Sequence, residues 1–265
     1  MLTNLPAAIE AQGVTVVRAP NWNSRRHALR GAALTGVRGI VIHTTETRDA
    51  TFAASSSAAP TLGFVASGLG YPLYNVLISR TGVAHIVTVG QAAHAGAGTW
   101  PDSSAGIPRD RANECTIGVS LDANGSRFKP TAAQLETLVR VVAGIRARAS
   151  GNLPVIMHGE WAPGRRSDPT GIPGGWTALR AALARGWWAT PPRMRVTRAT
   201  HLNLRTGPGV NNARVGSPIP ARTIVHPTGR RQGDWIELRT QWMVDNRPTA
   251  APVWAHGHYL EAVAA

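Results

Sequence analysis

Two histidines in this sequence each end a short apolar segment. His43 closes Val-Arg-Gly-Ile-Val-Ile-His, and His158 closes Leu-Pro-Val-Ile-Met-His. In α/β sheets functional groups collect where strands end. One such histidine is more simply explained as a hydrogen-bonded strand cap, whereas two favour a shared site. Asp168 follows His158 by ten residues in a loop bounded by glycine and proline, and its carboxylate can fold back toward both imidazoles.

Two imidazoles and one carboxylate are a known ligand set for catalytic zinc, with the fourth tetrahedral position left for water. Zinc lowers the pKa of bound water toward about 7 and polarises a carbonyl, so the set predicts hydrolysis of an amide at neutral pH. Spacing alone does not bring the ligands together, because His43 lies far from the other two and no HExxH helix is present.

The elements that would position these residues alternate between strand-like and helical patterns. Apolar runs predict buried strands over 37–42, 74–79 and 155–157. Helical spacing of Leu135, Leu138, Val142 and Ile145, after a Pro-Thr entry signal, predicts a helix over 131–149. This mixture predicts an α/β layer structure.

The helical period disappears after Pro191-Pro192, a pair that favours extended backbone. Short strand candidates follow at 201–205, 223–225 and 235–238, separated by glycine-rich turns, which is typical of a small all-β barrel. We therefore expect a first domain over 1–186, a linker over 187–194 and a second domain over 195–265.

Composition narrows the class of protein. The 265 residues carry 28 Lys and Arg against 14 acids, a formal charge of +14, with Lys129 the single lysine. Either a polyanionic partner or an arginine-rich genome explains this balance. Cys115 is the single cysteine, which excludes an intrachain disulfide framework and is interpreted as an inert core thiol. The first residues do not read as a signal peptide and no apolar run reaches membrane-spanning length.

Several segments occur in the order found in one enzyme family: Val-Ile-His43-Thr-Thr, Leu-Tyr74-Asn-Val-Leu-Ile, Ala-His94-Ala-Gly, Thr-Ile-Gly118-Val and His158-Gly-Glu-Trp-Ala-Pro-Gly-Arg-Arg-Ser-Asp168-Pro. Over about 35–185 the chain resembles zinc-dependent N-acetylmuramoyl-L-alanine amidases of type 2, which are related to peptidoglycan recognition proteins and common among bacteriophage endolysins. The resemblance implies a central mixed sheet flanked by helices. It also implies one zinc ion held by His43, His158 and Asp168, and cleavage of the amide between the muramic acid lactyl group and L-Ala.

The same resemblance suggests three helpers. Tyr74 matches the family's catalytic tyrosine, and His94 matches a histidine that lines the substrate groove. Arg166 stands where many relatives have lysine; because arginine is a poor proton donor, we assign it to binding the oxyanion or the substrate carbonyl. Ser120 occupies the place of a glutamate base found in some relatives, so either no carboxylate base is needed, or Glu46 or Glu160 supplies it.

The segment from 195 to 262 resembles a bacterial Src-homology-3-like domain, through Leu-Asn-Leu-Arg, Gly-Pro-Gly and Gly-Asp-Trp-Ile-Glu-Leu. This resemblance implies a module that binds the cell wall. The stretch 241–252 is longer than a compact barrel loop needs. Candidate stacking residues are Trp235, Trp242, Trp254 and Tyr259, some of which must instead fill the small core.

Together these features predict a monomeric, zinc-dependent endolysin that is made in the cytoplasm, inserts in no membrane and reaches the wall after a separate factor releases it. Peptidoglycan is the expected partner, with anionic wall polymers attracted by the basic surface. One alternative is a non-catalytic peptidoglycan recognition protein. A nucleic-acid-binding protein is the other alternative, although no basic helix or reading motif supports it.

Overall fold

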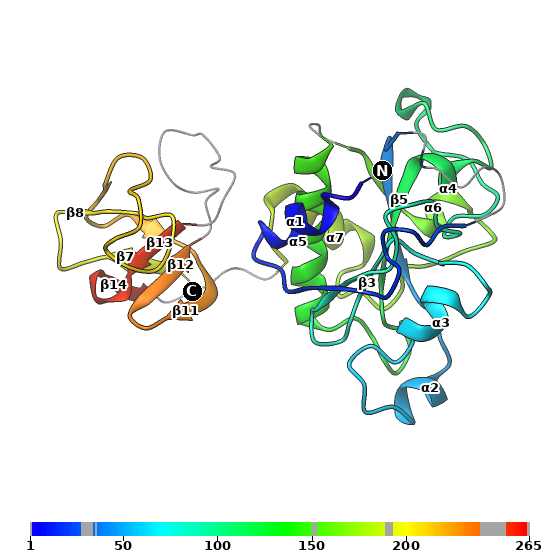
Figure 1. Cartoon of the computed structure of the whole chain (residues 1–265), viewed down its shortest axis with the longest axis horizontal. Helices are drawn as coiled ribbons and strands as arrows, with labels where there is room; N and C mark the ends of the chain where they lie inside the picture. The colour runs from blue at the N-terminus through cyan, green and yellow to red at the C-terminus, as the bar shows by residue number, and fades with distance from the viewer. Residues whose placement is uncertain are drawn as a thin grey trace. The chain divides into compact units, whose positions relative to one another are not determined.

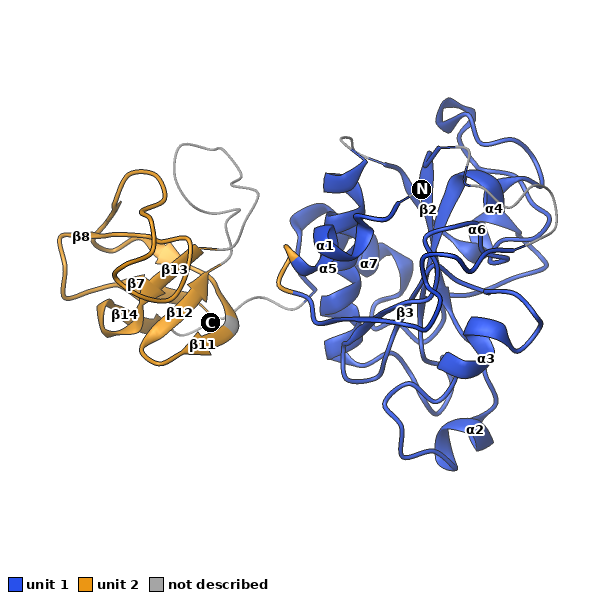
Figure 2. Ribbon diagram, viewed as in Figure 1, with its two compact units in different colours: residues 1–10, 14–189 blue, residues 11–13, 190–265 orange. Residues whose placement is uncertain are grey.

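The structure is a computed structural model that describes residues 2–27, 34, 36–149, 153–188, 193–238 and 253–263. The chain forms two compact units, one of residues 1–10 and 14–189, the other of residues 11–13 and 190–265 (Figure 2). Each unit has a hydrophobic core of its own. Residues 189–192 of the predicted linker lie outside the described residues, and the predicted domain limits stay predictions.

A six-stranded sheet organises the first unit, in the order β1-β4-β3-β5-β2-β6. Every neighbouring pair is parallel except β3 and β4, so the predicted central mixed sheet is confirmed. The strands are β1 Val16–Arg18, β2 Gly39–Thr44, β3 Val76–Ile78, β4 Ala84–Ile86, β5 Thr116–Leu121 and β6 Val155–Met157.

Helices cover both faces of this sheet (Figure 1). The largest core joins one face to α1, α5 and α7. Two smaller cores on the other face hold residues of α3, α4 and α6. The helices are α1 Leu5–Glu10, α2 Asp49–Ala53, α3 Leu62–Ser67, α4 Ala112–Cys115, α5 Ala132–Arg148, α6 His158–Trp161 and α7 Gly175–Arg185, with a 3-10 turn at Ser103–Ala105.

The longest helix begins where the Pro-Thr signal predicts. The Thr131 hydroxyl accepts a hydrogen bond from the Gln134 amide, and the Gln134 side chain accepts one from the Thr131 amide, which together make a capping box. The buried positions of α5 repeat at helical spacing and pack on the sheet. This packing fixes the back of the sheet, so the opposite face is left for polar side chains.

Alternation along the strands decides which residues reach that opposite face. Ile40 and Ile42 of β2 belong to the large core, whereas Val41 belongs to a core on the other face. Successive side chains of a strand point to opposite faces, so His43 lies on the same face as Val41. In β5 the residues Ile117, Val119 and Leu121 fill the large core. Thr116, Gly118 and Ser120 therefore share the face of His43.

The second unit is all-β, as predicted. Its strands form the three sheets β10-β7-β14, β11-β12-β13 and β8-β9 around a common apolar core. The strands are β7 Arg193–Val196, β8 His201–Leu202, β9 Ile219–Pro220, β10 Ile224–Val225, β11 Pro227–Gln232, β12 Trp235–Leu238, β13 Val253–His256 and β14 Leu260–Val263, with a 3-10 turn at Gly257–Tyr259. The resemblance to a Src-homology-3-like domain stays a prediction.

No helix among the described residues has both the length and the apolar character needed to cross a bilayer.

Candidate metal centre and active site

Two parallel strands bring the predicted ligands His43 and His158 to one edge of the sheet. β2 pairs with β6 in the register Ile40 with Val155 and Ile42 with Met157. The residue after each of the last two is a histidine, and parallel strands end on the same side. His43 is fully buried in β2, and His158 is the first residue of α6. The sheet register alone therefore places the two imidazoles side by side.

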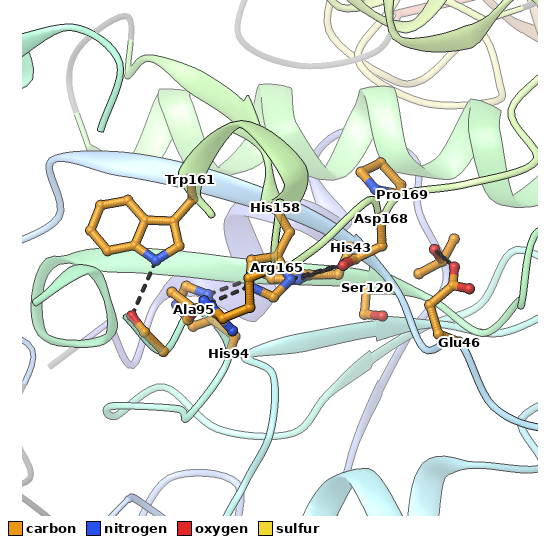
Figure 3. A network of polar contacts seen from close by, with 12 residues as sticks. His43, Glu46, His94, Ala95, Ser120, His158, Trp161, Arg165, Asp168 and Pro169 are labelled. Atoms are coloured by element: carbon orange, nitrogen blue, oxygen red, sulfur yellow. Dashed lines mark hydrogen bonds and ion pairs between the residues drawn. The ribbon is translucent and has the colours of Figure 1, made fainter. Parts of the chain in front are cut away.

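Asp168 completes the cluster from the loop that follows α6. Its backbone carbonyl accepts a hydrogen bond from the Gly159 amide at 2.8 Å, which folds the loop back onto the start of the helix. Its Oδ2 lies 3.2 Å from His43 Nδ1, and its Oδ1 lies 3.0 Å from His158 Nδ1 (Figure 3). One donor atom from each of the three buried residues lies within 4.8 Å of the others.

The outward nitrogens of both rings also have partners. His158 Nε2 lies 3.0 Å from the carbonyl oxygen of Ala95, so this nitrogen carries the proton and donates it. A neutral His158 ring then directs the lone pair of Nδ1 at the Asp168 carboxylate. Two acceptors at this separation repel each other, and a cation between them removes the repulsion. The donor set therefore fits a divalent metal such as zinc.

Burial sets the protonation of this cluster. It lowers the pKa of His43 from 6.5 to about 4, an effect to which the neighbouring His158 contributes and which Asp168 opposes. Burial alone would raise the pKa of Asp168, but hydrogen bonds from His158 and His43 outweigh it and hold this pKa well below its ordinary value. Metals bind neutral imidazole and ionised carboxylate, so His43 and Asp168 are already in the binding form at neutral pH.

His94 lies behind His43 and is almost completely buried. Its Nδ1 is 3.2 Å from His43 Nε2, and its Nε2 is 3.2 Å from the Thr116 hydroxyl. A Cβ at Gly118 would lie 2.5 Å from the His94 ring, so only glycine at this point of β5 admits the histidine. The sequence reasoning missed this contact with His43. A role for His94 in contacting substrate stays a prediction.

Tyr74 lies just before β3, beside His43. The two ring centroids are 5.0 Å apart. Burial and the nearby Asp168 carboxylate raise the pKa of Tyr74, so its phenol stays protonated at neutral pH. A protonated hydroxyl at this place can donate a hydrogen bond to a developing negative charge.

The adjacent arginines Arg165 and Arg166 differ in what they contact. The Arg165 guanidinium donates to the carbonyl oxygens of Ala95, at 2.9 Å, and Ala97, which ties the loop of His94 to the loop of Asp168. Arg166 is exposed and its guanidinium forms no hydrogen bond or ion pair with any described residue. Its positive charge nevertheless lowers the pKa of both His43 and Tyr74 as one of several contributions. Arg166 therefore lies within electrostatic reach of the cluster and is available to a ligand.

The two carboxylates considered as a general base are also placed differently. Glu160 accepts hydrogen bonds from the Met157 amide at 2.8 Å and from the Arg180 guanidinium at 2.6 Å, so it holds the turn before His158. Glu46 is exposed and accepts from the hydroxyls of Thr44 and Thr170. Ser120 is buried in register with His43. Of the two carboxylates, Glu46 is the one with solvent access.

The aromatic residues predicted to bind wall components in the second unit have mixed surroundings. Trp254 is buried, with the Arg230 guanidinium 5.6 Å from its ring centroid. Tyr259 packs against the core, and Trp235 lies 5.3 Å from His256. Trp242 and the rest of 241–252 lie outside the described residues. The buried Trp254 and the core-packed Tyr259 account for part of the small core.

Residues 33–171 match the sequence model of the family described as N-acetylmuramoyl-L-alanine amidase. The match covers more than half of the chain and contains every residue of the cluster. The chain therefore belongs to this amidase family. The comparison with curated proteins gives no match.

Solved structures with similar chains are also amidases by their descriptions. The selenomethionine derivative of AmpD is 20% identical, with 63% of this chain and 93% of that chain covered and a TM-score of 0.44. AmpDh3 from Pseudomonas aeruginosa is 23% identical, with 69% of each chain covered and a TM-score of 0.42. LysC from Clostridium intestinale is 11% identical, with 64% and 97% covered and a TM-score of 0.44. The family assignment depends on none of these values.

Proposed function

We propose that the first unit is a zinc-dependent amidase that cleaves the bond between the lactyl group of N-acetylmuramic acid and L-alanine in peptidoglycan. The observation that carries the proposal is the convergence of His43, His158 and Asp168, whose donor atoms lie within 4.8 Å of one another. The family match supports the same reaction class. Zinc held by these three residues would supply a Lewis acid for water and for the amide carbonyl.

The chain's own residues complete the chemistry. His94 and the Ala95 carbonyl hold the two imidazoles with Nδ1 toward the carboxylate, so the ligand set needs little rearrangement on binding a metal. The protonated Tyr74 phenol donates a hydrogen bond to the oxygen on which negative charge develops. Arg166 stabilises the same charge electrostatically and stays protonated while doing so. Glu46 is the carboxylate best exposed to accept a proton from water.

The products distinguish this reaction from the other ways of cutting a wall. Digestion of purified peptidoglycan should release new N-terminal L-alanine and free lactyl carboxylates, without new reducing sugar ends. New reducing ends would show a glycosidase, and new termini elsewhere in the stem peptide would show a peptidase. Binding without any cleavage would favour the alternative of a non-catalytic recognition protein.

We also propose that the chain acts as an endolysin whose second unit holds it on the wall. Weak binding to an immobile polymer raises the effective concentration of the first unit near its many scissile bonds. Addition of the protein from outside to bacteria with accessible walls should lower turbidity. A variant that ends at residue 188 tests the targeting role, because it should cleave soluble muramyl peptides normally and intact walls slowly. Equal rates on both substrates would remove that role.

A further inference from the structure

The second unit carries a groove with arginine on several sides. Its volume is about 640 Å³, and it is lined by nine residues, of which four are arginines and none is acidic. The nine are Arg193, Arg195, Val196, Thr197, Arg198, Ala199, Ala221, Arg222 and Ile224. The site described above uses none of these residues.

Strand alternation explains why two of the arginines share one side of the groove. Arg193 and Arg195 of β7 are exposed, whereas Met194 and Val196 between and after them pack against the core of this unit. Residues two apart in a strand are separated by about 7 Å and point to the same face. The strand therefore presents two positive charges in a row.

The other two arginines come from turns that are tied to the same strand. The Arg222 amide donates to the Val196 carbonyl at 2.9 Å, the Val196 amide donates to Thr223 at 3.0 Å, and the Ala221 amide donates to Thr200 at 2.7 Å. Arg198 has φ 53° and Arg222 has φ 66°, both in the left-handed region that arginine seldom adopts. Hydrogen-bonded backbone thus holds both side chains at the rim of the groove.

All four guanidinium groups are available to a ligand. Each arginine is exposed, and within the described part of the chain none of the four side chains makes a hydrogen bond or an ion pair. Glu261 of β14 stands opposite Arg195 in the strand register but does not line the groove. Like charges this close repel one another, so the unliganded groove stores repulsion that an anion would relieve.

We propose that this arginine groove binds a phosphodiester-linked polymer of the bacterial cell wall, an inference that rests on the proposed function for its setting. Four charges along an open groove suit a chain of repeated anions better than one small ion. A phosphodiester has two charged oxygens that protrude tetrahedrally, so guanidinium groups from β7 and from the turns can bind it together. The groove would then anchor the enzyme through a component other than its substrate.

Sedimentation of the full chain with purified walls tests the proposal. The walls are used before and after hydrofluoric acid extraction, which removes phosphodiester-linked polymers, at 4 °C and short incubation. The groove variant is Arg195→Gln with Arg222→Gln. The control variant is Arg214→Gln with Arg231→Gln, which removes the same charge from two exposed arginines outside the groove.

We expect the groove variant to bind untreated walls at least tenfold more weakly than the wild type and the control variant. Extraction should weaken binding of the wild type and leave the groove variant unaffected. Equal losses in the two variants would show a general charge effect and overturn the proposal. Wild-type binding that survives extraction would do the same, as would tighter binding to duplex DNA than to walls at equal phosphate concentration.

Cleavage of a soluble muramyl peptide by the same preparations separates this proposal from the proposed function. All three proteins should cleave it at the same rate, because the groove is outside the first unit. Absence of cleavage by the wild type would reject the amidase activity, while the sedimentation result would still decide whether the groove binds the polymer.

Discussion

The two polar sites of this molecule use charge in opposite ways. In the first unit His43, His158 and Asp168 are buried, and each has partners within 3.2 Å. In the second unit the arginines of the groove are exposed and, so far as the structure describes the chain, unpaired. A buried, preorganised cluster selects by geometry, whereas an exposed row of like charges attracts at longer range and weakens with salt. The comparison assigns chemistry to the first site and attachment to the second.

Acid should expose the cost of burying the first site. The unfolded chain takes up a proton on His43 near pH 6.5, whereas the folded chain does so only near pH 4. The unfolded state therefore binds more protons in this window, and the free energy of unfolding of the metal-free chain should fall by on the order of 3 kcal/mol as pH drops through it. Urea unfolding at several pH values in the presence of a chelator measures this loss.

The matched variant is His43→Asn, which removes the titrating ring. Its stability should decline less steeply between pH 6.5 and pH 4 than that of the wild type. Identical slopes for the two proteins would mean that the burial of His43 does not govern its proton affinity.

The neighbouring arginines sharpen the distinction between charge that acts on substrate and charge that holds the fold. Arg166→Gln should lower kcat by about 10²-fold with little change in Tm, because it removes a cation from the reacting oxygen. Arg165→Gln should lower Tm by a few degrees and kcat by less than tenfold, since its guanidinium bridges two loops. Steady-state kinetics and thermal unfolding of both variants check this. The reverse pattern would exchange the two assignments.

His94 tests how far the first site depends on residues that touch no metal. His94→Ala frees Nε2 of His43, so zinc affinity should weaken by about 10- to 100-fold. Competition with a chromophoric chelator measures the affinity without any need for turnover. His201→Ala, on an exposed strand of the second unit, is the control. An unchanged affinity in His94→Ala would leave only the predicted contact with substrate.

The smallest effect concerns the backbone of the groove. Glycine adopts positive φ without the Cβ clash that arginine has, so Arg222→Gly should stabilise the second unit by about 1 kcal/mol or less while removing a charge. Urea unfolding measures the gain. A loss of stability would show that the Arg222 side chain supports the fold.

The sequence predicted the elements whose signals are local. β6 was predicted over its full length, and α5 within one residue of each end, because the capping signal at Thr131 and the apolar spacing lie within the helix itself. β2 begins two residues later than the apolar run suggested and includes His43 and Thr44. The α/β class followed from this alternation.

Other features depend on partners far along the chain and left no local signal. β7 begins inside the predicted linker, because Arg193 and Met194 become strand only by pairing with Val263 and Ala262. β1 has three residues and exists through its pairing with β4. The contact between His94 and His43 required both the loop of residue 94 and the space above Gly118. The groove likewise joins residues from two separate segments.

The metal content of the purified full chain tests the central claim most directly. The wild type should hold one zinc ion per chain and lose its amidase activity when a chelator removes the ion. Asp168→Ala, which removes the carboxylate between the two imidazoles, should hold almost none and be inactive. Full activity of a chain shown to be free of metal, or undiminished zinc in Asp168→Ala, would contradict the claim that these three residues form the metal centre.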